Sequence, residues 1–522
     1  MYVFRNNTIE RFFPRDYSFS GYGNISDIPD AESYLWFYQA PLGFDQEAVA
    51  KEIGSYSQQL NIVLSHISSS KMLIALTMVE MYGISPTEND TRVREAITAY
   101  NDGLYSAAEH FPNVKVIDLS DFTKNYDDSE LIDWKYYFIS QMGLNPKLAK
   151  PFCQWFDKKL EQIERKRKKC LVLDLDNTLW GGVLGEDGIE GIKIGGDYPG
   201  KAFLYFQQAL HELSSNGVIL AVCSKNNEED VLAAWSKNPF MLLKQDDFVA
   251  WRINWEDKAS NLQSLAEELN IGLDSIVFID DNPSERELIR KVLPSVIVPD
   301  FPEHPYDLPV FYKHLLDNYF KVYSVTAEDR AKTEQYKANA RRAESQKHFT
   351  DIEEFLKSLE LHLTITRSNE FNIPRISQLT QKTNQFNLTT MRYTDTDIKQ
   401  MEKQGNRIWC VSVADRFGDS GITGCIIING NRIDSFLLSC RVLGKGVEDA
   451  FIKSVLRILR EDGAKNIDAS YIPSPKNNQV KDYYERCGFS CYEIEPNGTK
   501  HYNMDLRTAD LSIKDYIKIT VL

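Results

Sequence analysis

The sequence lacks the features that would place the chain in a membrane or an oxidising compartment. No segment approaches the roughly 20 consecutive apolar residues that a membrane helix needs, and residues 1–16 contain no apolar signal core. The 8 cysteines include no Cys-x-x-Cys pair, which favours reduced thiols over a disulfide framework or a zinc site. We therefore expect a cytoplasmic protein with no membrane partner.

Positive charge is also scarce. The chain has 60 Lys and Arg against 75 Asp and Glu, a formal net charge of -15. Nucleic-acid binding needs a surface that is positive overall or locally. The basic run at 165–169 directly precedes a strand-like segment, so we interpret it as a solvated linker. The charge thus argues against nucleic acid as the main partner.

The length of 522 residues suggests about three domains. Apolar strand-like runs alternate with helix-like runs in the first and second thirds of the chain, the pattern of parallel α/β domains. The last third again has strand-like runs with helices between them. The predicted divisions are an N-terminal α/β domain at 1–125, a helical linker at 126–167, a central α/β domain at 168–302, a helical connector at 303–360, a C-terminal domain at 361–508 and a tail at 509–522.

Polar residues follow three apolar runs of the central block, at Asp174, Ser224 and Asp280. Ligands bind at the carboxyl ends of the strands in an open parallel sheet, so we expect these residues to converge. Asp176 is two residues beyond Asp174 and points the same way in extended backbone. Asp281 adds a further carboxylate.

Four carboxylates in one crevice oppose one another's ionisation. A bound divalent cation removes this conflict, and oxygen ligands that include carboxylates and substrate phosphate select magnesium. Ser224 and Lys258 add a hydroxyl donor and a fixed positive charge, which a phosphoryl group needs. The constellation predicts a magnesium-dependent phosphoryl-transfer site.

These elements resemble, in type and order, the four motifs of the haloacid dehalogenase superfamily. The matching segments are DLDNT at 174–178, CS at 223–224, Lys258 and FIDDNPSERE at 278–287. The resemblance implies that Asp174 attacks phosphorus to form an aspartyl phosphate and that Asp176 transfers protons. It also implies magnesium ligands from Asp174, the Asp176 carbonyl, and Asp280 or Asp281, with Asp281 slightly favoured.

Motif spacing bears on access to the site. Many relatives insert a cap domain between the first and second motifs or between the second and third. Here 50 residues separate Asp174 from Ser224, and 34 separate Ser224 from Lys258, which is room for one or two helices. The glycine-rich segment at 180–191 could form only a short flap. We therefore expect a capless, Rossmann-like parallel sheet with an open site.

Longer strings resemble the FkbH-like subfamily (subfamily IIIC) of this superfamily. They are DLDNTLWGGVLGEDG at 174–188, VCSKNNEEDV at 222–231, QLTQKTNQFNLTTMRYT at 378–394 and DRFGDSGITG at 415–424. The resemblance implies dephosphorylation of a phosphoglycerate-type acyl donor and delivery of the glyceryl unit as a thioester to an acyl carrier protein. It further implies a cysteine acyl intermediate, for which Cys223 is the best-placed residue.

The C-terminal block resembles acetyltransferases of the GNAT type, which have an α+β fold. SCRVLGKGVEDAF at 439–451 contains Arg441, Gly444 and Gly446 at the start of a helix, where backbone N–H groups could hold a pyrophosphate. NNQVKDYYERCGF at 477–489 matches a later signature of that family. The resemblance leaves three roles open: binding of coenzyme A, binding of a carrier's phosphopantetheine thiol, or simple coverage of the central site.

The N-terminal block resembles, by position, the SGNH-hydrolase-like domain of this subfamily. It has no Gly-Asp-Ser start near the N-terminus, so we expect a degenerate, non-hydrolytic domain.

Three functions therefore compete. The first is an acyl transferase that dephosphorylates a small phosphorylated donor and loads a carrier protein, and the second is a small-molecule phosphatase. Both use the same phosphate site, so only Cys223 and the C-terminal block distinguish them. The third is a scaffold that docks carrier proteins, and the intact pair of Asp174 and Asp176 argues against it.

Overall fold

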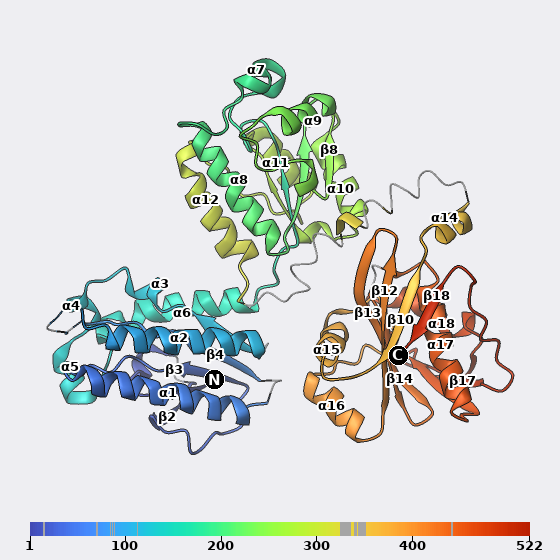
Figure 1. Cartoon of the computed structure of the whole chain (residues 1–522), viewed down its shortest axis with the longest axis horizontal. Coiled ribbons are helices and arrows are strands. Elements are labelled where there is room, and N and C mark those ends of the chain that lie inside the picture. The colour runs from blue at the N-terminus through green and yellow to red at the C-terminus, as the bar shows by residue number, and fades with distance from the viewer. Residues whose placement is uncertain are drawn as a thin grey trace. The chain divides into compact units, whose positions relative to one another are not determined.

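The computed structural model divides the chain into two compact units, one made by residues 1–168 with the connector from Val310 onward, the other by residues 169–309 with the C-terminal part. Figure 1 shows the whole chain. The structure describes residues 1–13, 16–68, 71–83, 85, 87, 89–111, 113–323, 336–338, 342, 351–439 and 442–522. Within these ranges, no helix combines the length and the apolar character that crossing a bilayer requires.

Five parallel strands form the N-terminal sheet in the order β2-β1-β3-β4-β5. The strands are β1 (Tyr2–Arg5), β2 (Ser18–Tyr22), β3 (Ser33–Phe37), β4 (Met72–Leu76) and β5 (Val114–Ile117). The helices are α1 (Gln46–His66), α2 (Arg92–His110), α3 (Ser120–Thr123), α4 (Asp128–Leu131), α5 (Trp134–Ser140) and α6 (Ala149–Glu164). The parallel α/β prediction is confirmed, although the sequence pattern did not identify β1 and β2.

Helices cover both faces of this sheet. Along β3, Tyr34 and Trp36 pack with α1 and α2, whereas Leu35 and Phe37 pack on the opposite face with α6. Side chains alternate between faces because a strand has a period of two. Residues 126–167, predicted as a linker, are helical but belong to this unit, because the aromatic side chains of α6 are buried against the sheet.

The central sheet has four parallel strands in the order β8-β7-β6-β9. The strands are β6 (Cys170–Leu173), β7 (Ile219–Ser224), β8 (Ala250–Ile253) and β9 (Ile276–Ile279). The helices are α7 (Leu184–Gly191), α8 (Gly200–Ser215), α9 (Glu228–Lys237), α10 (Lys258–Glu268) and α11 (Pro283–Val292). The order reverses at β6, which lies between β7 and β9, so the carboxyl ends of β6 and β9 form a topological switch point.

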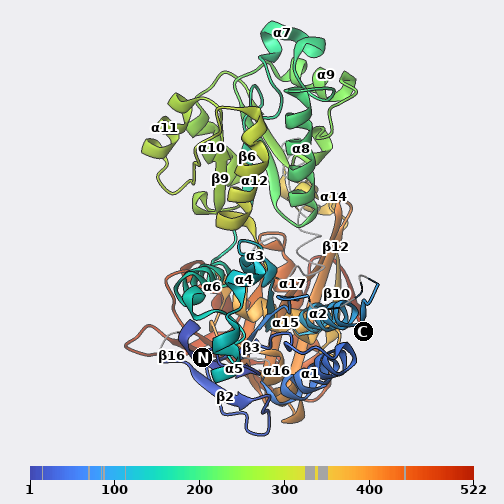
Figure 2. The same cartoon turned by 90° about the vertical axis from the view of Figure 1, so that its left-hand side faces the viewer.

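Helices also lie on both faces of the central sheet. Figure 2 shows α8 on one side of β6 and α11 on the other. The side chains of α10 and α11 pack against alternate residues of β6, β7 and β9. Two helices, α7 and α8, lie between the first and second motifs. Between the second and third motifs, α9 is the only helix longer than one turn. The prediction of a capless parallel α/β fold is confirmed.

The C-terminal sheet is mixed, with the order β16-β17-β15-β14-β13-β12-β10-β18 and β11 paired to β14. The strands are β10 (His362–Arg367), β11 (Phe386–Asn387), β12 (Arg407–Asp415), β13 (Gly418–Asn429), β14 (Arg432–Leu438), β15 (Asn466–Tyr471), β16 (Ser490–Ile494), β17 (Lys500–Asp505) and β18 (Lys518–Val521). The helices are α14 (Ile352–Ser358), α15 (Ile373–Lys382), α16 (Asp395–Lys403), α17 (Val447–Glu461) and α18 (Tyr483–Arg486).

This domain also has three layers. Helices α15 and α16 pack on one face of the sheet and α17 on the other (Figure 1). The segment at 509–522 is not a free tail, because β18 pairs in parallel with β10 and Leu511 and Ile517 are buried in the core. Helix α14, which we placed in the connector, contributes Phe355 to the same core and is part of this domain.

The described part of the connector supports the helical prediction. Helix α12 (Leu308–Leu315) continues as a π-helical turn at Leu316–Phe320. Most of 324–350, for which we predicted an exposed helix, lies outside the described residues.

Candidate functional site

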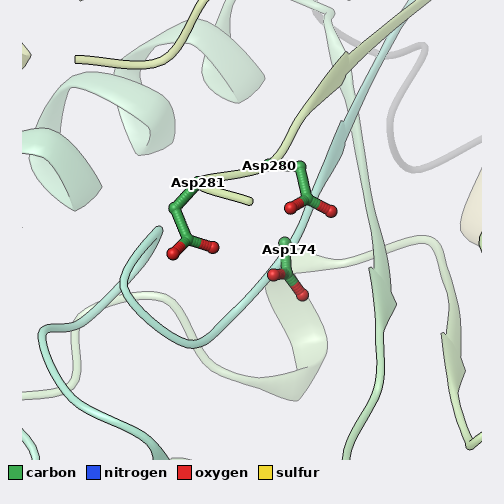
Figure 3. A group of neighbouring side chains, drawn as sticks. All are labelled: Asp174, Asp280 and Asp281. Carbon is green, nitrogen blue, oxygen red and sulfur yellow. The ribbon is translucent and has the colours of Figure 1, made fainter. Parts of the chain in front are cut away.

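Three carboxylates meet at the switch point of the central sheet. Asp174 follows β6, and Asp280 and Asp281 follow β9. Oxygen atoms of all three lie within 4.8 Å of one another (Figure 3). They converge because β6 and β9 are parallel neighbours whose ends are in register, with Leu173 opposite Ile279. The structure thus brings these three predicted metal ligands together.

Lys258 provides positive charge beneath this cluster. It is the first residue of α10, and Asp257 caps the helix by accepting a hydrogen bond from the Ser260 N–H. Its Nζ atom lies 2.5 Å from Asp280 Oδ2 and 3.2 Å from Asp174 Oδ1. Burial opposes the charged form of Lys258, but Asp174 and Asp280 outweigh it and raise its pKa.

One lysine does not balance three carboxylates. Burial raises the pKa of Asp174 to about 7; Lys258 opposes the shift and Asp280 adds to it. The pKa of Asp281 is also raised, by burial first and then by Asp280. The buried Oδ1 atom of Asp174 accepts no hydrogen bond of good geometry, despite its proximity to Lys258. An oxygen that has an ion pair but no hydrogen bond, beside two more carboxylates, fits a hard divalent cation such as magnesium, whose charge would favour the ionised form of Asp174.

The two acidic residues after β9 differ in their contacts. Asp280 is fully buried; its Oδ1 accepts from the Asn282 N–H at 2.9 Å and its Oδ2 contacts Lys258. Asp281 is only partly buried. Its carbonyl, like that of Asp280, accepts a hydrogen bond from Arg286. Asp281 therefore has more freedom to bind a cation, in line with the slight preference given to it from the sequence.

The Asp176 side chain is held by three donors. Its Oδ1 accepts from Trp180 Nε1 at 2.9 Å and from the Leu184 N–H at 3.0 Å. Its Oδ2 accepts from Asn226 Nδ2 at 3.0 Å. The carboxylate lies outside the three-carboxylate cluster, so any contribution of Asp176 to a metal site would come from its carbonyl, as we expected.

Asn226 is a site residue that the sequence pattern did not reveal. Its side chain joins two motifs, because Nδ2 also lies 3.2 Å from Ser224 Oγ. Ser224 ends β7 and is 1% exposed. The available signal was sequence proximity to Ser224 within SKNN at 224–227, but amides in a turn are usually structural.

The structure places Cys223 where an acyl-bearing role is disfavoured, and that role stays a prediction. Its side chain is buried in the core formed with α10 and α11, and its Sγ lies 3.9 Å from the Lys258 carbonyl. Burial raises the pKa of the Cys223 thiol to about 12, which disfavours the thiolate. Adjacent strand residues point to opposite faces, so a residue next to Ser224 faces away from it.

Gly444 and Gly446 lie in the turn that precedes α17 in the C-terminal domain. Gly444 and Gly446 have φ values of 75° and 79°, and Gly446 caps α17. These left-handed conformations favour glycine. The Gly444 N–H is used within the domain, because it donates to Glu448 Oε1 at 3.3 Å. Arg441, the third predicted residue of this motif, lies outside the described residues.

Comparison with known proteins gave structural neighbours alone. No family model matches the chain, and no curated protein does. The N-terminal part of the protein BF1531 from Bacteroides fragilis, containing a phosphatase domain complexed with Mg, is 29% identical. This match covers 62% of the present chain and 94% of that chain, with a TM-score of 0.49.

Two further structural neighbours, which match smaller parts of the chain, have lower TM-scores. A spermidine N-acetyltransferase variant from Vibrio cholerae is 15% identical over 28% of this chain and 94% of its own, with a TM-score of 0.22. Rv2747 from Mycobacterium tuberculosis, solved in complex with CoA, is 13% identical over 27% of this chain and 98% of its own, also with a TM-score of 0.22. All three TM-scores are below 0.5, so the function proposed for this chain rests on its own residues and geometry.

Proposed function

We propose that the chain is a magnesium-dependent phosphotransfer enzyme of the haloacid dehalogenase type. The observation that carries the proposal is the buried cluster of Asp174, Asp280 and Asp281 around Lys258 at a topological switch point. A scaffold has no use for buried charges that destabilise the fold unless they are compensated. The same groups suit the binding of a cation and a phosphoryl group.

Magnesium would be held by Asp174, Asp281 and the Asp176 carbonyl, and would supply positive charge to the phosphoryl oxygens. Asp174 attacks phosphorus, and the bond between phosphorus and the leaving oxygen breaks. An acyl phosphate then releases a carboxylate, which needs no proton. Asp176 accepts a proton from the water that hydrolyses the aspartyl phosphate. Lys258 and Ser224 bind the phosphoryl oxygens.

We propose further that the donor is a phosphoglycerate-type acyl phosphate and that the glyceryl unit passes to an acyl carrier protein thiol. This finer proposal comes from the FkbH-like strings, of which those at 174–188 and 222–231 contribute residues to the site described above. Because Cys223 is buried and its thiolate is disfavoured, the carrier thiol, or another cysteine, would attack the acyl carbon of the intact acyl phosphate. The bond between the acyl carbon and the bridging oxygen then breaks and phosphate leaves, so this route replaces the attack of Asp174 on phosphorus, which would release a free carboxylate.

A second candidate function is a small-molecule phosphatase. The burial of Cys223 favours it, because a phosphatase needs the phosphate site but no acyl-bearing thiol. In that case water is the final acceptor of the phosphoryl group, and no carrier protein participates.

Phosphate release and intact-mass spectrometry separate these candidates. The full chain is incubated with an acyl phosphate, magnesium and a carrier protein bearing its phosphopantetheine thiol. The phosphotransfer proposal expects phosphate release that stops with excess chelator or with Asp174→Asn. The transferase proposal also expects a mass increase on the carrier, whereas phosphate release with an unchanged carrier mass favours the phosphatase. Normal release by Asp174→Asn would overturn both.

A further inference from the structure

Strands β14 and β15 of the C-terminal domain are parallel neighbours that diverge. They share a single residue pair, Arg432 with Asp468. Strand β14 continues to Leu438, and its other edge stays paired with β13 over its whole length. Beyond Arg432, the edge of β14 that faces β15 therefore makes no strand pairing with β15. We call the space between the two diverging strands the split.

A segment from elsewhere in the domain lies in this split. Residues 386–389, which we call the wedge, lie between α15 and α16 in the sequence. Phe386 and Asn387 form β11, which pairs antiparallel with Leu438 and Leu437 of β14. Because β13 occupies one edge of β14, β11 must occupy the edge that faces β15.

The wedge also reaches the β15 side of the split. The Leu388 N–H donates to the Phe436 carbonyl at 3.1 Å, and the Leu388 carbonyl accepts from the Ile472 N–H at 2.8 Å. Ile472 directly follows β15. The wedge thus makes main-chain hydrogen bonds to both walls, in the manner of a strand added between them.

Side chains fix the wedge in place. The ring of Phe386 packs edge-on against Phe436 and Tyr483, with centroid distances of 5.4 and 5.0 Å. Asn477 Nδ2 donates to the Asn387 carbonyl at 2.9 Å, and Thr389 Oγ1 donates to the Asp434 carbonyl at 3.1 Å. All four wedge residues are at most 5% exposed. The wedge is therefore part of the core, and an open split would leave these backbone groups unpaired.

The neighbouring glycine turn gives a second, independent observation. Glu448 accepts the Gly444 N–H, one of the backbone donors that would otherwise be available to a phosphate. Its other carboxylate oxygen, Oε2, is buried without a hydrogen-bond partner. A carboxylate at the start of α17 competes with a phosphate for the same N–H groups and repels it when ionised.

We propose that the wedge is the resident occupant of the split, so that the C-terminal domain binds neither coenzyme A nor a pantetheine arm there. An extended thiol ligand would need the same edge of β14 that β11 already uses. Its phosphates would meet Glu448 at the glycine turn. This proposal does not rest on the phosphotransfer function. If a carrier thiol is a substrate, it reaches the acyl group without this split.

The test uses hydrogen exchange and calorimetry on the full chain, with coenzyme A and pantetheine as the probes. We expect no saturable heat from either compound. We expect peptides that cover 386–389 and 436–438 to exchange as slowly as the sheet core, with or without the probes. Saturable binding of either probe that changes exchange in these peptides would overturn the proposal. So would exchange of the wedge amides as fast as that of an exposed loop.

Asn477→Ala removes the side chain that donates to the Asn387 carbonyl of the wedge. Asn478→Ala is the matched control, because Asn478 is exposed whereas its neighbour Asn477 is fully buried. Of the four side-chain hydrogen bonds that Asn477→Ala removes, one is to the wedge. We expect its loss to accelerate exchange at 386–389 by about 10-fold, and Asn478→Ala to leave it unchanged. Equal exchange at 386–389 in the two variants would contradict the anchoring role. If Asn477→Ala fails to fold, the measurements on the wild-type chain still decide the proposal.

Discussion

Two parallel sheets in this chain have similar topology and different chemistry at their carboxyl edges. In the central sheet, Asp174 and Asp280 follow adjacent strands and share a buried lysine. In the N-terminal sheet, Asn6 follows β1 and Gln39 follows the adjacent strand β3. All four residues are buried, yet only the first pair carries charge.

The N-terminal edge satisfies most of its own polar groups. Asn6 Nδ2 donates to the Gln39 carbonyl at 2.8 Å, and Asn6 Oδ1 accepts from the Gln39 N–H at 2.9 Å. Asn7 Nδ2 donates to Gln39 Oε1 at 2.9 Å. Gly143 lies so close that an added Cβ would be 2.1 Å from Gln39 Oε1. Neutral amides pair with one another, whereas a surplus of buried carboxylates needs an external cation. A position at a strand end is therefore not sufficient for a cation site; uncompensated carboxylates at that position are also needed.

This comparison predicts that Lys258→Met has the largest effect, on both phosphate release and the stability of the central domain. Removal of the lysine leaves Asp174 and Asp280 buried without their counter-charge, so phosphate release should fall to background. The central domain should lose about 3–5 kcal/mol of stability without magnesium. Lys159→Met is the control, because Lys159 is also buried but its partner Asp121 keeps a second partner, Lys124, so the loss of stability should be smaller.

Urea titration with hydrogen exchange resolved by peptide measures both domains in one sample. Equal losses of stability in the two lysine variants would contradict the contrast between the two sheets.

Asp176→Asn should have the next largest effect. Proton transfer is worth roughly 10²- to 10⁴-fold in rate, so turnover of an alkyl phosphate should fall within that range. The loss should be smaller for an acyl phosphate, whose leaving carboxylate needs no proton. Steady-state rates on the two substrates make the comparison. An equal loss on both would exclude Asp176 as the proton donor to the leaving group.

Asn226→Ala should produce a smaller loss. The variant frees Asp176 Oδ2 and Ser224 Oγ but leaves every charged group in place. We expect kcat to fall by about 10-fold, the equivalent of one hydrogen bond to a charged group. Asn227→Ala, one residue further along the loop, is the control and should retain kcat. A loss confined to KM would instead place Asn226 in substrate binding.

Asn6→Ala should leave activity unchanged. It removes two hydrogen bonds with Gln39 and one with Tyr56, and should cost about 1–3 kcal/mol in that unit. Phosphate release per folded molecule should equal that of the wild type. A loss of phosphate release without unfolding would show that the two parallel sheets are functionally linked.

The convergence of the three carboxylates could be predicted from the sequence because Asp174 directly follows β6 and Asp280 and Asp281 are the first two residues after β9. Asp174, Asp280 and Asp281 are fixed by strand register alone, and their convergence needed no other information. Sequence adjacency to Ser224 hides the alternation of side chains between faces, so it did not reveal that Cys223 is buried on the face opposite Ser224. Asn226 was missed because its contact with Asp176 depends on how two loops fold toward each other.

The fold of the C-terminal domain was less accessible from sequence. The resemblance of its glycine turn to GNAT-type acetyltransferases suggested a cleft for a ligand and gave no sign of the wedge. The two-residue strand β11 is too short to give a periodic signal, and its partner strand β14 lies beyond two further strands. Strand β18 is similarly short and close to the chain end, so it was assigned to a tail. Non-local pairing of short segments is what single-sequence patterns convey least.

A crystal structure with magnesium and beryllium fluoride would test the central claim most directly, because beryllium fluoride on a carboxylate mimics an aspartyl phosphate. We predict beryllium bonded to an Asp174 oxygen, Lys258 and Ser224 in contact with the fluorides, and magnesium bound by Asp174 and Asp281. A magnesium ion absent from this cluster at saturating concentration, or beryllium fluoride bound to another residue, would contradict the assignment of the site.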